Sequence, residues 1–266
     1  MQRPNAVFDL TVNLMKTPIS IQLYSLRALP SLPDILDTAR SASYRHVELI
    51  GSHLDNAASV KQALDERGLS VSSAHVGIGA LRDRFDAVME ACKTLGFTQL
   101  FMPSVPPPER QSPEPYWTSL GRELGRMALR ARDHGIELGY HNHNWELRVQ
   151  ADGRTALECL FAGAGKSPLT WQVDVAWLVR GDADPVEWLE RYQDRIVSVH
   201  AKDLAPAGTK TDEDGWEDVG HGVLDWRNTL APASVKCGAR WLVAEHDKPS
   251  DPARFARNSF AFLDSL

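Results

Sequence analysis

The sequence predicts an α/β fold, a single (β/α)8 TIM barrel with its active site at the C-terminal face of the strands. Short apolar strands rich in β-branched residues alternate with amphipathic helical stretches along the chain. Glycine follows several of these helices immediately before the next strand, where a left-handed helix cap favours it. Eight such units in 266 residues match the usual size of this barrel, about 250 residues.

The predicted strands and helices alternate from residue 18 to residue 264. The strands cover residues 18–24, 46–50, 70–75, 98–102, 136–141, 169–174, 196–200 and 241–245. The helices cover residues 31–42, 55–67, 82–94, 114–134, 155–163, 184–193, 225–236 and 251–264. The capping glycines are Gly68, Gly96, Gly135 and Gly238. We expect residues 1–16 to form an N-terminal extension and residues 17–266 to form the barrel domain.

A doubly wound open sheet is the structural alternative to the barrel. No G-x-G-x-x-G or G-x-x-x-x-G-K-[ST] motif follows a predicted strand, so the nucleotide-binding versions of that fold receive no support. Two connections are unusually long: "SVPPPERQSPEPYW" after strand 98–102 and "KDLAPAGTKTDEDGWEDVGHGVLDW" after strand 196–200. In a barrel, both stand over the C-terminal face, where long loops commonly cover the active site.

The composition is that of an ordinary globular protein, with 43% hydrophobic and 24% charged residues and a formal net charge of −6. An acidic surface repels phosphate backbones, so we expect no nucleic-acid partner. The three cysteines (Cys92, Cys159 and Cys237) have neither disulfide nor zinc-cluster spacing and are expected to be reduced thiols. Since no apolar run approaches about 20 residues and no convincing signal peptide opens the chain, we expect no membrane partner and a cytoplasmic location.

Polar side chains stand at the end of seven of the eight predicted strands, strand 98–102 being the exception. They are Gln22, Tyr24, Glu48, His75, His141, His143, Asp174, His200, Lys202, Glu245 and Asp247. Each of them alone is well explained as a satisfied core residue or the first polar group of a loop. Because burying charged and imidazole groups is costly unless they are paired or metal-bound, the recurrence favours a polar funnel at the barrel mouth.

Four of these residues, on consecutive strands, suit a metal ion. His141, Asp174, His200 and Glu245 offer two imidazoles and two carboxylates, a ligand set for one divalent ion such as Mn, Co, Fe, Zn or Mg. Thiolate ligation is not expected, because no cysteine lies at a strand end. The four residues are far apart in sequence, so this prediction depends on the barrel fold.

The chain resembles the xylose isomerase-like barrels of the sugar phosphate isomerase/epimerase family. The matching stretches are "IQLYSLR", "VELIG", "GYHNHNWEL", "VDVAWLVRGDADPVEWL", "VHAKDL", "VGHGVLDW" and "VAEHD". The resemblance implies a divalent metal held by a Glu on the fifth strand, an Asp on the sixth, a His on the seventh and a Glu on the eighth. Asp174, His200 and Glu245 match the last three, but the fifth strand ends on His141. We therefore predict His141 as the ligand and Glu146 as a substrate-hydroxyl or second-layer partner, with the reverse assignment as the alternative.

The resemblance also implies proton-transfer chemistry on a keto-sugar. Members of the family use the glutamates of the fifth and eighth strands as paired acid and base, so Glu245 retains a catalytic role here. Because the fifth-strand glutamate is missing, the base has to be another group, with His143 and Lys202 as candidates. The hypothesis is α-proton abstraction through a metal-stabilised enediolate, followed by isomerisation or epimerisation. Loss of a β-oxygen leaving group would instead give a lyase or dehydratase, and a non-catalytic sugar-binding barrel is the third alternative.

Further residues are candidates for holding the sugar or polyol substrate. Gln22, Glu48, His75 and Glu146 offer hydrogen bonds, and Trp177 offers an aromatic face, as do Trp117 and Trp145. Plugging of the barrel mouth and ordinary core packing are the competing interpretations of these residues. A phosphate site in barrels commonly lies in the loops after the last two strands. Because the loop after strand 196–200 has one lysine among several acids, we expect a neutral sugar or glycoside; a homo-oligomer stays open.

Overall fold

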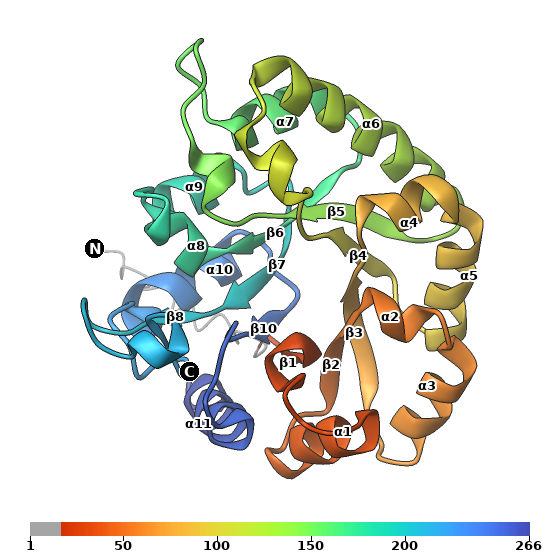
Figure 1. The fold of residues 1–266 in the computed structure, drawn as a ribbon, viewed down its shortest axis with the longest axis vertical. Helices are drawn as coiled ribbons and strands as arrows, with labels where there is room; N and C mark the ends of the chain where they lie inside the picture. Colours follow the sequence, from red (N-terminus) through yellow and green to blue (C-terminus); the bar gives the residue numbers. More distant parts are fainter. Residues whose placement is uncertain (1–16) are drawn as a thin grey trace, which may run out of the picture.

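The computed structural model describes residues 17–266, and in this range eight parallel strands form a closed barrel (Figure 1). They are β1 (Ile19–Gln22), β2 (His46–Ile50), β3 (Ser70–His75), β4 (Gln99–Met102), β5 (Glu137–His141), β6 (Thr170–Asp174), β7 (Ile196–Ala201) and β10 (Leu242–Ala244). Each strand pairs in parallel with its predecessor, and β10 closes the barrel against β1. The predicted (β/α)8 barrel is confirmed, whereas the predicted extension 1–16 lies outside the described residues.

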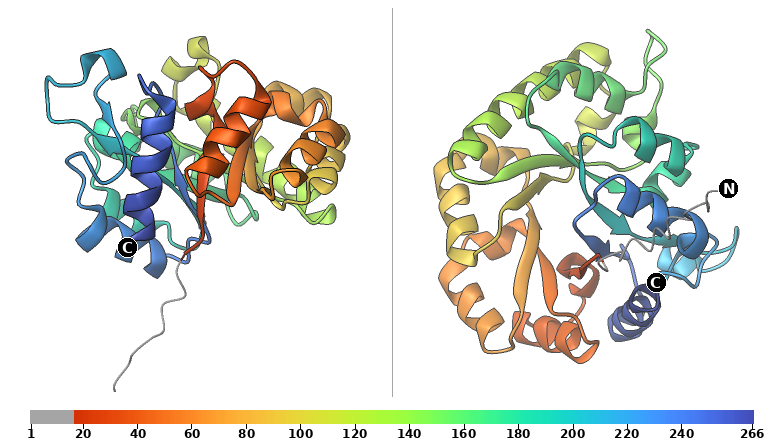
Figure 2. Two further views of the ribbon diagram at one scale, coloured as in Figure 1. Left: turned by 90° about the horizontal axis from the view of Figure 1, so that it is seen from below. Right: turned by 180° about the vertical axis from the view of Figure 1, so that it is seen from behind.

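Helices cover the outside of the barrel, as both views of Figure 2 show. They are α1 (Leu32–Ser41), α2 (Gly51–Leu54), α3 (Ala57–Asp65), α4 (Ile78–Asp83), α5 (Phe85–Leu95), α6 (Glu114–Asp133), α7 (Ala156–Ala164), α8 (Val175–Arg180), α9 (Pro185–Arg191), α10 (Ala231–Lys236) and α11 (Pro252–Asp264). The short helices α2, α4 and α8 were not predicted, because four to six residues are too few to display a helical period. The predicted helix 225–236 is divided, since a π-helical turn (Trp226–Leu230) precedes α10.

Glycines terminate helices and allow close packing, as the sequence pattern indicates. Gly96 ends α5 with a φ of 78°, the left-handed conformation that favours glycine. Gly121 lies where α6 crosses α7, and a Cβ atom there would lie only 1.9 Å from the carbonyl oxygen of Leu160. The two helices can therefore approach closely because position 121, like Gly163 on α7, has no side chain.

The barrel has an apolar outer layer and a polar interior. Side chains alternate along each strand, so Trp171 and Val173 of β6 belong to the apolar core while Gln172 and Asp174 belong to the buried polar set. Further buried polar side chains of the strands are Ser20, Gln22, Glu48, Ser73, Ser198 and His200. Barrel interiors are more often filled by branched apolar residues. These buried polar side chains continue to the polar residues at the carboxyl ends of the strands, such as Asp174 and His200.

The long connection after β7 carries a two-stranded antiparallel ribbon, β8 (Asp203–Leu204) and β9 (Trp216–Glu217). The connection after β4 contains the 3-10 turn η2 (Pro107–Gln111). Cys92, Cys159 and Cys237 are free and buried, in agreement with the expected thiols. No helix within residues 17–266 is long and apolar enough to cross a membrane.

Candidate metal and sugar site

The four side chains of the predicted metal site converge at the carboxyl ends of neighbouring strands. His141 ends β5, Asp174 ends β6, His200 lies in β7, and Glu245 follows β10 directly. One potential ligand atom from each lies within 4.8 Å of the others, and all four residues are buried. Strand pairing explains the convergence, because Asp174 is in register with His200 and His200 with Val243, two residues before Glu245.

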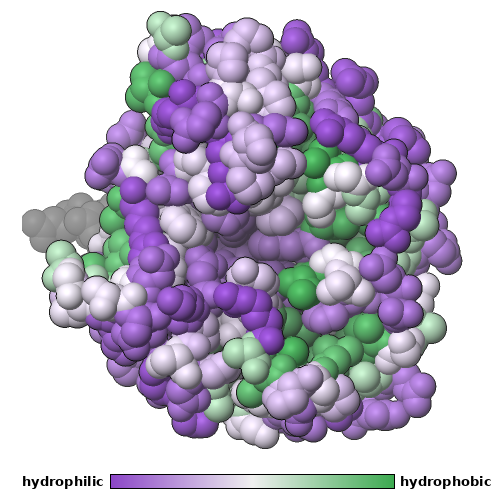
Figure 3. Space-filling model, viewed as in Figure 1, coloured by the Kyte–Doolittle hydropathy of each residue, from purple (hydrophilic) through white to green (hydrophobic). Residues whose placement is uncertain are grey.

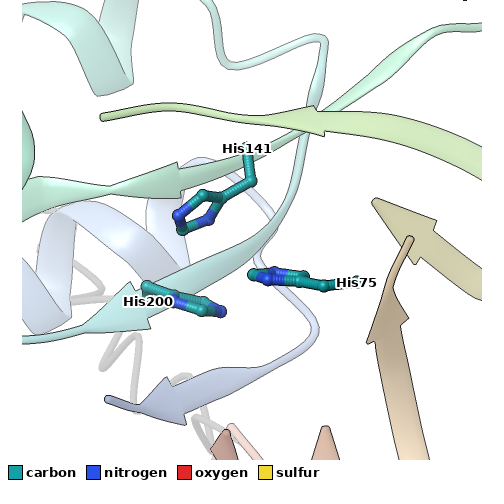
Figure 4. Close-up of side chains that lie close together, drawn as sticks. All are labelled: His75, His141 and His200. Carbon is teal, nitrogen blue, oxygen red and sulfur yellow. The ribbon is translucent and has the colours of Figure 1, made fainter. Parts of the chain in front are cut away.

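A third imidazole faces the same space. His75 ends β3, and Figure 4 shows the rings of His75, His141 and His200 turned toward one another inside the barrel. The rings of His75 and His200 are stacked, with centroids 5.2 Å apart, and those of His141 and His200 meet edge to face at 4.5 Å. Potential ligand atoms of these three histidines also lie within 4.8 Å of one another.

The charges around the four residues fit a bound cation. Burial raises the pKa of Asp174 to about 6, although the nearby Lys202 opposes this shift. Burial alone would lower the pKa of His200, but the charges of Glu48 and Glu245 raise it to about 10. The buried carboxylates therefore stabilise positively charged groups beside them, and His200, between Glu48 and Glu245, stays protonated. A divalent ion held by two imidazoles and two carboxylates would supply that charge instead.

Lys202 is fully buried beside this cluster and is held by three carboxylates. Its Nζ lies 2.8 Å from Asp247, 2.9 Å from Glu245 and 3.4 Å from Asp174. Burial lowers the pKa of this amine, but the three acids, Asp247 foremost, raise it above its ordinary value. Lys202 is therefore a charged donor, which suits delivery of a proton or a hydrogen bond better than proton abstraction.

His143 lies next to the cluster as a neutral imidazole. Its ring is stacked on Trp145 at 4.1 Å and contacts the ring of His141 at 5.2 Å. Its Nδ1 is buried and has no hydrogen-bond partner among the described residues. Burial, followed by the charge of Lys202, lowers the pKa of His143 well below its ordinary value. A neutral imidazole has one ring nitrogen without a proton, so a neutral His143 beside the cluster has the properties of a general base.

Glu146 is turned away from the four-residue cluster. Tyr140 precedes His141 in β5, so its side chain points to the opposite face of the strand, and its hydroxyl donates to Glu146 Oε1 at 2.6 Å. The backbone N–H of His143 donates to Oε2 at 2.9 Å. Glu146 is fully buried, and burial raises its pKa to about 7. Of the two fifth-strand candidates, the structure brings His141 and not Glu146 to the other three potential ligands.

The candidate hydroxyl partners Gln22, Glu48 and His75 belong to the network inside the barrel. The Gln22 amide donates to Glu48 at 2.7 Å, and His75 Nε2 lies 2.6 Å from Gln172 Oε1. Glu48 is fully buried and both of its oxygens have partners. A substrate hydroxyl would have to displace one of these partners to reach it. Gln172 was missed by the sequence analysis, although its two-residue spacing from Asp174 places it on the same face of β6.

Aromatic residues form one wall of the mouth. Trp177 lies 5.2 Å from the His143 ring and 4.7 Å from Trp216, measured between ring centroids. The guanidinium of Arg110, in the turn η2, stacks over Trp145 at 3.7 Å. Trp117, by contrast, is fully buried in α6 and donates to the Ser112 carbonyl, so it is a core residue. Figure 3 shows a hollow bordered by hydrophilic residues on the face viewed in Figure 1.

The fold and this cluster define a TIM barrel with a candidate metal site at the mouth. The chain belongs to the xylose isomerase-like TIM barrel family, whose model matches residues 36–266. It is 22% identical to an inosose dehydratase of Lacticaseibacillus casei over 166 residues, 56% of this chain and 54% of the relative. A second inosose dehydratase, from Clostridium botulinum, is 28% identical over 93 residues, 35% of this chain and 30% of that relative. The chain thus spans about half or less of the curated relatives it matches.

Solved structures of this fold include isomerases, epimerases and a probable dehydratase. A sugar phosphate isomerase/epimerase from Parabacteroides distasonis superposes with a TM-score of 0.76 at 22% identity, covering 100% of this chain and 99% of that one. A 3-keto-D-glucoside 4-epimerase from E. coli has a TM-score of 0.67 at 16% identity, with 94% and 100% covered. A probable 3-DHS dehydratase from Bacillus anthracis has a TM-score of 0.69 at 12% identity, with 93% and 98% covered. At these identities the likeness concerns the fold.

Proposed function

We propose that the protein is a divalent-metal-dependent isomerase or epimerase of a keto-sugar or related polyol, acting by removal of the proton next to the carbonyl. The observation that carries this proposal is the buried cluster of His141, Asp174, His200 and Glu245 beside the neutral, unpartnered imidazole of His143. The names of the structural neighbours, which include epimerases and isomerases of sugars, agree with this chemistry.

His141, Asp174, His200 and Glu245 would hold the metal. When bound, a divalent ion supplies a Lewis acid that polarises the substrate carbonyl and makes the neighbouring C–H more acidic. His143 takes this proton, because a neutral imidazole near pH 7 has one ring nitrogen without a proton. Stacking on Trp145 holds the ring in place for the transfer.

Lys202 and Glu245 are the groups assigned to deliver the second proton. The Lys202 ammonium donates to Glu245 at 2.9 Å, so the pair holds a proton that can be delivered to the substrate. Return of a proton to the former carbonyl carbon, with loss of the hydroxyl proton of the carbon that was deprotonated, gives an isomer. Return of a proton to the opposite face of the deprotonated carbon gives an epimer. The Trp177 indole, next to His143, offers an apolar surface for the C–H face of the sugar.

A lyase or dehydratase is the second candidate, and two observations favour it. The curated relatives that match the chain are inosose dehydratases. The carboxyl end of β5 presents His141 instead of a glutamate, so the site is not a symmetric pair of carboxylates. A neutral imidazole and a charged amine also suit removal of a proton followed by protonation of a departing hydroxyl.

Metal content tests the site first. We would measure bound metals by mass spectrometry in the wild type and in the His141→Ala and Glu146→Ala variants. The expected result is about one Mn, Co, Fe or Zn per chain, lost with His141 and kept with Glu146. Loss with Glu146 alone would overturn the ligand assignment, and absence of metal from every form after reconstitution would favour a non-catalytic barrel.

Deuterium exchange tests the reaction. Keto-sugars, inososes and 3-keto-glycosides would be incubated with metal-loaded protein in D2O and followed by proton NMR. Exchange without loss of water indicates an isomerase or epimerase, whereas an unsaturated product indicates the dehydratase. His143→Gln is expected to retain metal and lose exchange by about 10²–10⁴-fold, while His134→Gln, just after α6 and far from the site, keeps wild-type exchange. Full exchange in His143→Gln would refute the assigned base.

A further inference from the structure

Glu48 lies at the centre of the polar network inside the barrel. It is fully buried in β2, and its two oxygens accept hydrogen bonds from four side chains. The donors are Gln22 Nε2 at 2.7 Å, Ser73 Oγ at 2.5 Å, Gln172 Nε2 at 2.6 Å and His200 Nε2 at 2.7 Å. All of these groups can donate, so Glu48 is held as an acceptor on every side.

The contact with His200 determines which nitrogen of that ring faces the metal site. His200 Nδ1 lies 2.9 Å from Glu245, which belongs to the proposed ligand cluster, and Nε2 points to Glu48 on the opposite side. An ionised carboxylate only accepts, so Nε2 carries the proton in this pair. His200 Nδ1 then has a lone pair for the metal whenever a metal replaces its proton.

Gln172 transmits the same constraint to His141. Its Nε2 donates to Glu48 at 2.6 Å and to Ser198 Oγ at 3.2 Å, which orients the amide. The amide oxygen consequently faces His141 Nδ1, 3.1 Å away, and a carbonyl oxygen only accepts. His141 therefore carries its proton on Nδ1 and presents the Nε2 lone pair to the metal site. The same oxygen, 2.6 Å from His75 Nε2, also orients that ring.

We propose that Glu48 is a positioning residue that sets the tautomers of both histidine ligands, acting on His200 directly and on His141 through Gln172. This inference rests on the proposed metal site. It assigns Glu48 a role other than binding a substrate hydroxyl, since no oxygen of this carboxylate is available to a ligand. This role also accounts for the polar interior of the barrel. Glu48 lies on β2, whereas the ligands lie on β5, β6, β7 and at the end of β10, so polar side chains inside the barrel have to connect them.

The central test is the metal affinity of Glu48→Gln. The new amide group would face a donor on at least one side, either His200 or Gln172, so the ligand orientations would no longer be fixed. We expect Mn²⁺ and Zn²⁺, titrated separately into metal-free full-length protein by calorimetry, to bind about 10–100-fold more weakly. Glu213→Gln is the matched control: Glu213 is also a buried carboxylate, held by Arg254 and Ser250, but it lies outside the ligand cluster. It should keep wild-type affinity.

Nitrogen NMR separates positioning from a general loss of structure. In zinc-loaded, ¹⁵N-labelled protein, side-chain correlations should show His200 protonated on Nε2 and His141 on Nδ1. Gln172→Met keeps the Glu48–His200 contact and removes the relay, so it should change the signals of His141 and His75 but leave that of His200 unchanged. This variant also tests the proposal if Glu48→Gln does not fold.

Each outcome has a defined meaning. Wild-type metal affinity in Glu48→Gln, or the opposite tautomers in the wild type, would overturn the positioning role and leave the metal site intact. Equal losses of affinity in Glu48→Gln and Glu213→Gln would also overturn it. A wild type that binds neither metal would overturn the proposed function itself, and the role of Glu48 with it.

Discussion

Glu146 makes the stability of this protein depend on pH in a way that one substitution should remove. Its carboxyl group is fully buried, and burial raises its pKa from 4.5 to about 7. The folded protein therefore holds the proton more tightly than the unfolded chain does. Such a group contributes its full stability below about pH 4.5 and loses it as the pH rises through about 7. The relevant comparison is wild type against Glu146→Gln, which is neutral at every pH.

The size of the effect follows from the shift. Each pKa unit corresponds to about 1.4 kcal/mol, so a shift from 4.5 to about 7 corresponds to about 3 kcal/mol. Between these two pH values only the folded state keeps the proton, and the free energy of unfolding falls by about 1.4 kcal/mol per pH unit. In the Glu146→Gln variant, the new amide can donate to the Tyr140 oxygen and accept from the His143 N–H, so both present contacts have a replacement.

Urea unfolding of both proteins at pH 4.5, 5.5, 6.5 and 7.5 measures this contribution. All other titrating groups are shared, so the difference between the two pH profiles isolates Glu146. We expect the wild type to lose about 3 kcal/mol relative to Glu146→Gln over this range, and the variant to bind metal normally. Parallel profiles would refute the reasoning, because they would mean that folding does not raise the pKa of Glu146.

Further predictions concern packing, a loop anchor and the substrate. Gly121→Ala should lower the free energy of unfolding, measured in urea, by about 3 kcal/mol, because the new Cβ would push α6 away from α7. Gly79→Ala in α4 is the control: its new Cβ would meet no other part of the described structure within 4 Å, so it should be neutral or stabilising. The Asp203 carboxylate accepts hydrogen bonds from the backbone N–H groups of Leu204, Gly220, Gly222 and Leu224. Asp203→Asn should therefore lower the urea midpoint, with a loss of about 3 kcal/mol in the free energy of unfolding. An unchanged midpoint would contradict the role of Asp203 as the anchor of this loop. Finally, a neutral ketose should be turned over at least as well as its phosphate ester, since carboxylates already hold Lys202 and Lys210; a strong preference for the ester would disprove this.

The barrel and the position of its site could be predicted from local patterns. Apolar strands, amphipathic helices and capping glycines such as Gly96 recur with a regular spacing, and each depends on the conformational preferences of a few consecutive residues. Parallel strands of a barrel bring their carboxyl ends to one face, so polar residues at the strand ends, such as His141 and Asp174, were expected to meet. The structure brings them together within 4.8 Å.

The partners of these residues depended on the tertiary structure. Glu48 looked like any polar strand-end residue, yet the closed barrel surrounds it with donors from β1, β3, β6 and β7. Glu146 lies five residues after His141, but the turn that follows β5 directs it to Tyr140 instead of the metal site. Lys202 was predicted as a candidate base, but in the structure three carboxylates, one at the end of β6 and two after β10, hold its charged amine.

The sequence by itself determined the fold, the face on which the site lies and the residue types that reach it. These features follow from short-range preferences and from the alternation of side chains along a strand. Only the tertiary structure decided which groups are charged, which nitrogen faces the site and which carboxylate is available. The physical reason is that pKa values and tautomers depend on burial and on neighbours within a few ångströms, and in this barrel those neighbours come from strands up to 152 residues apart.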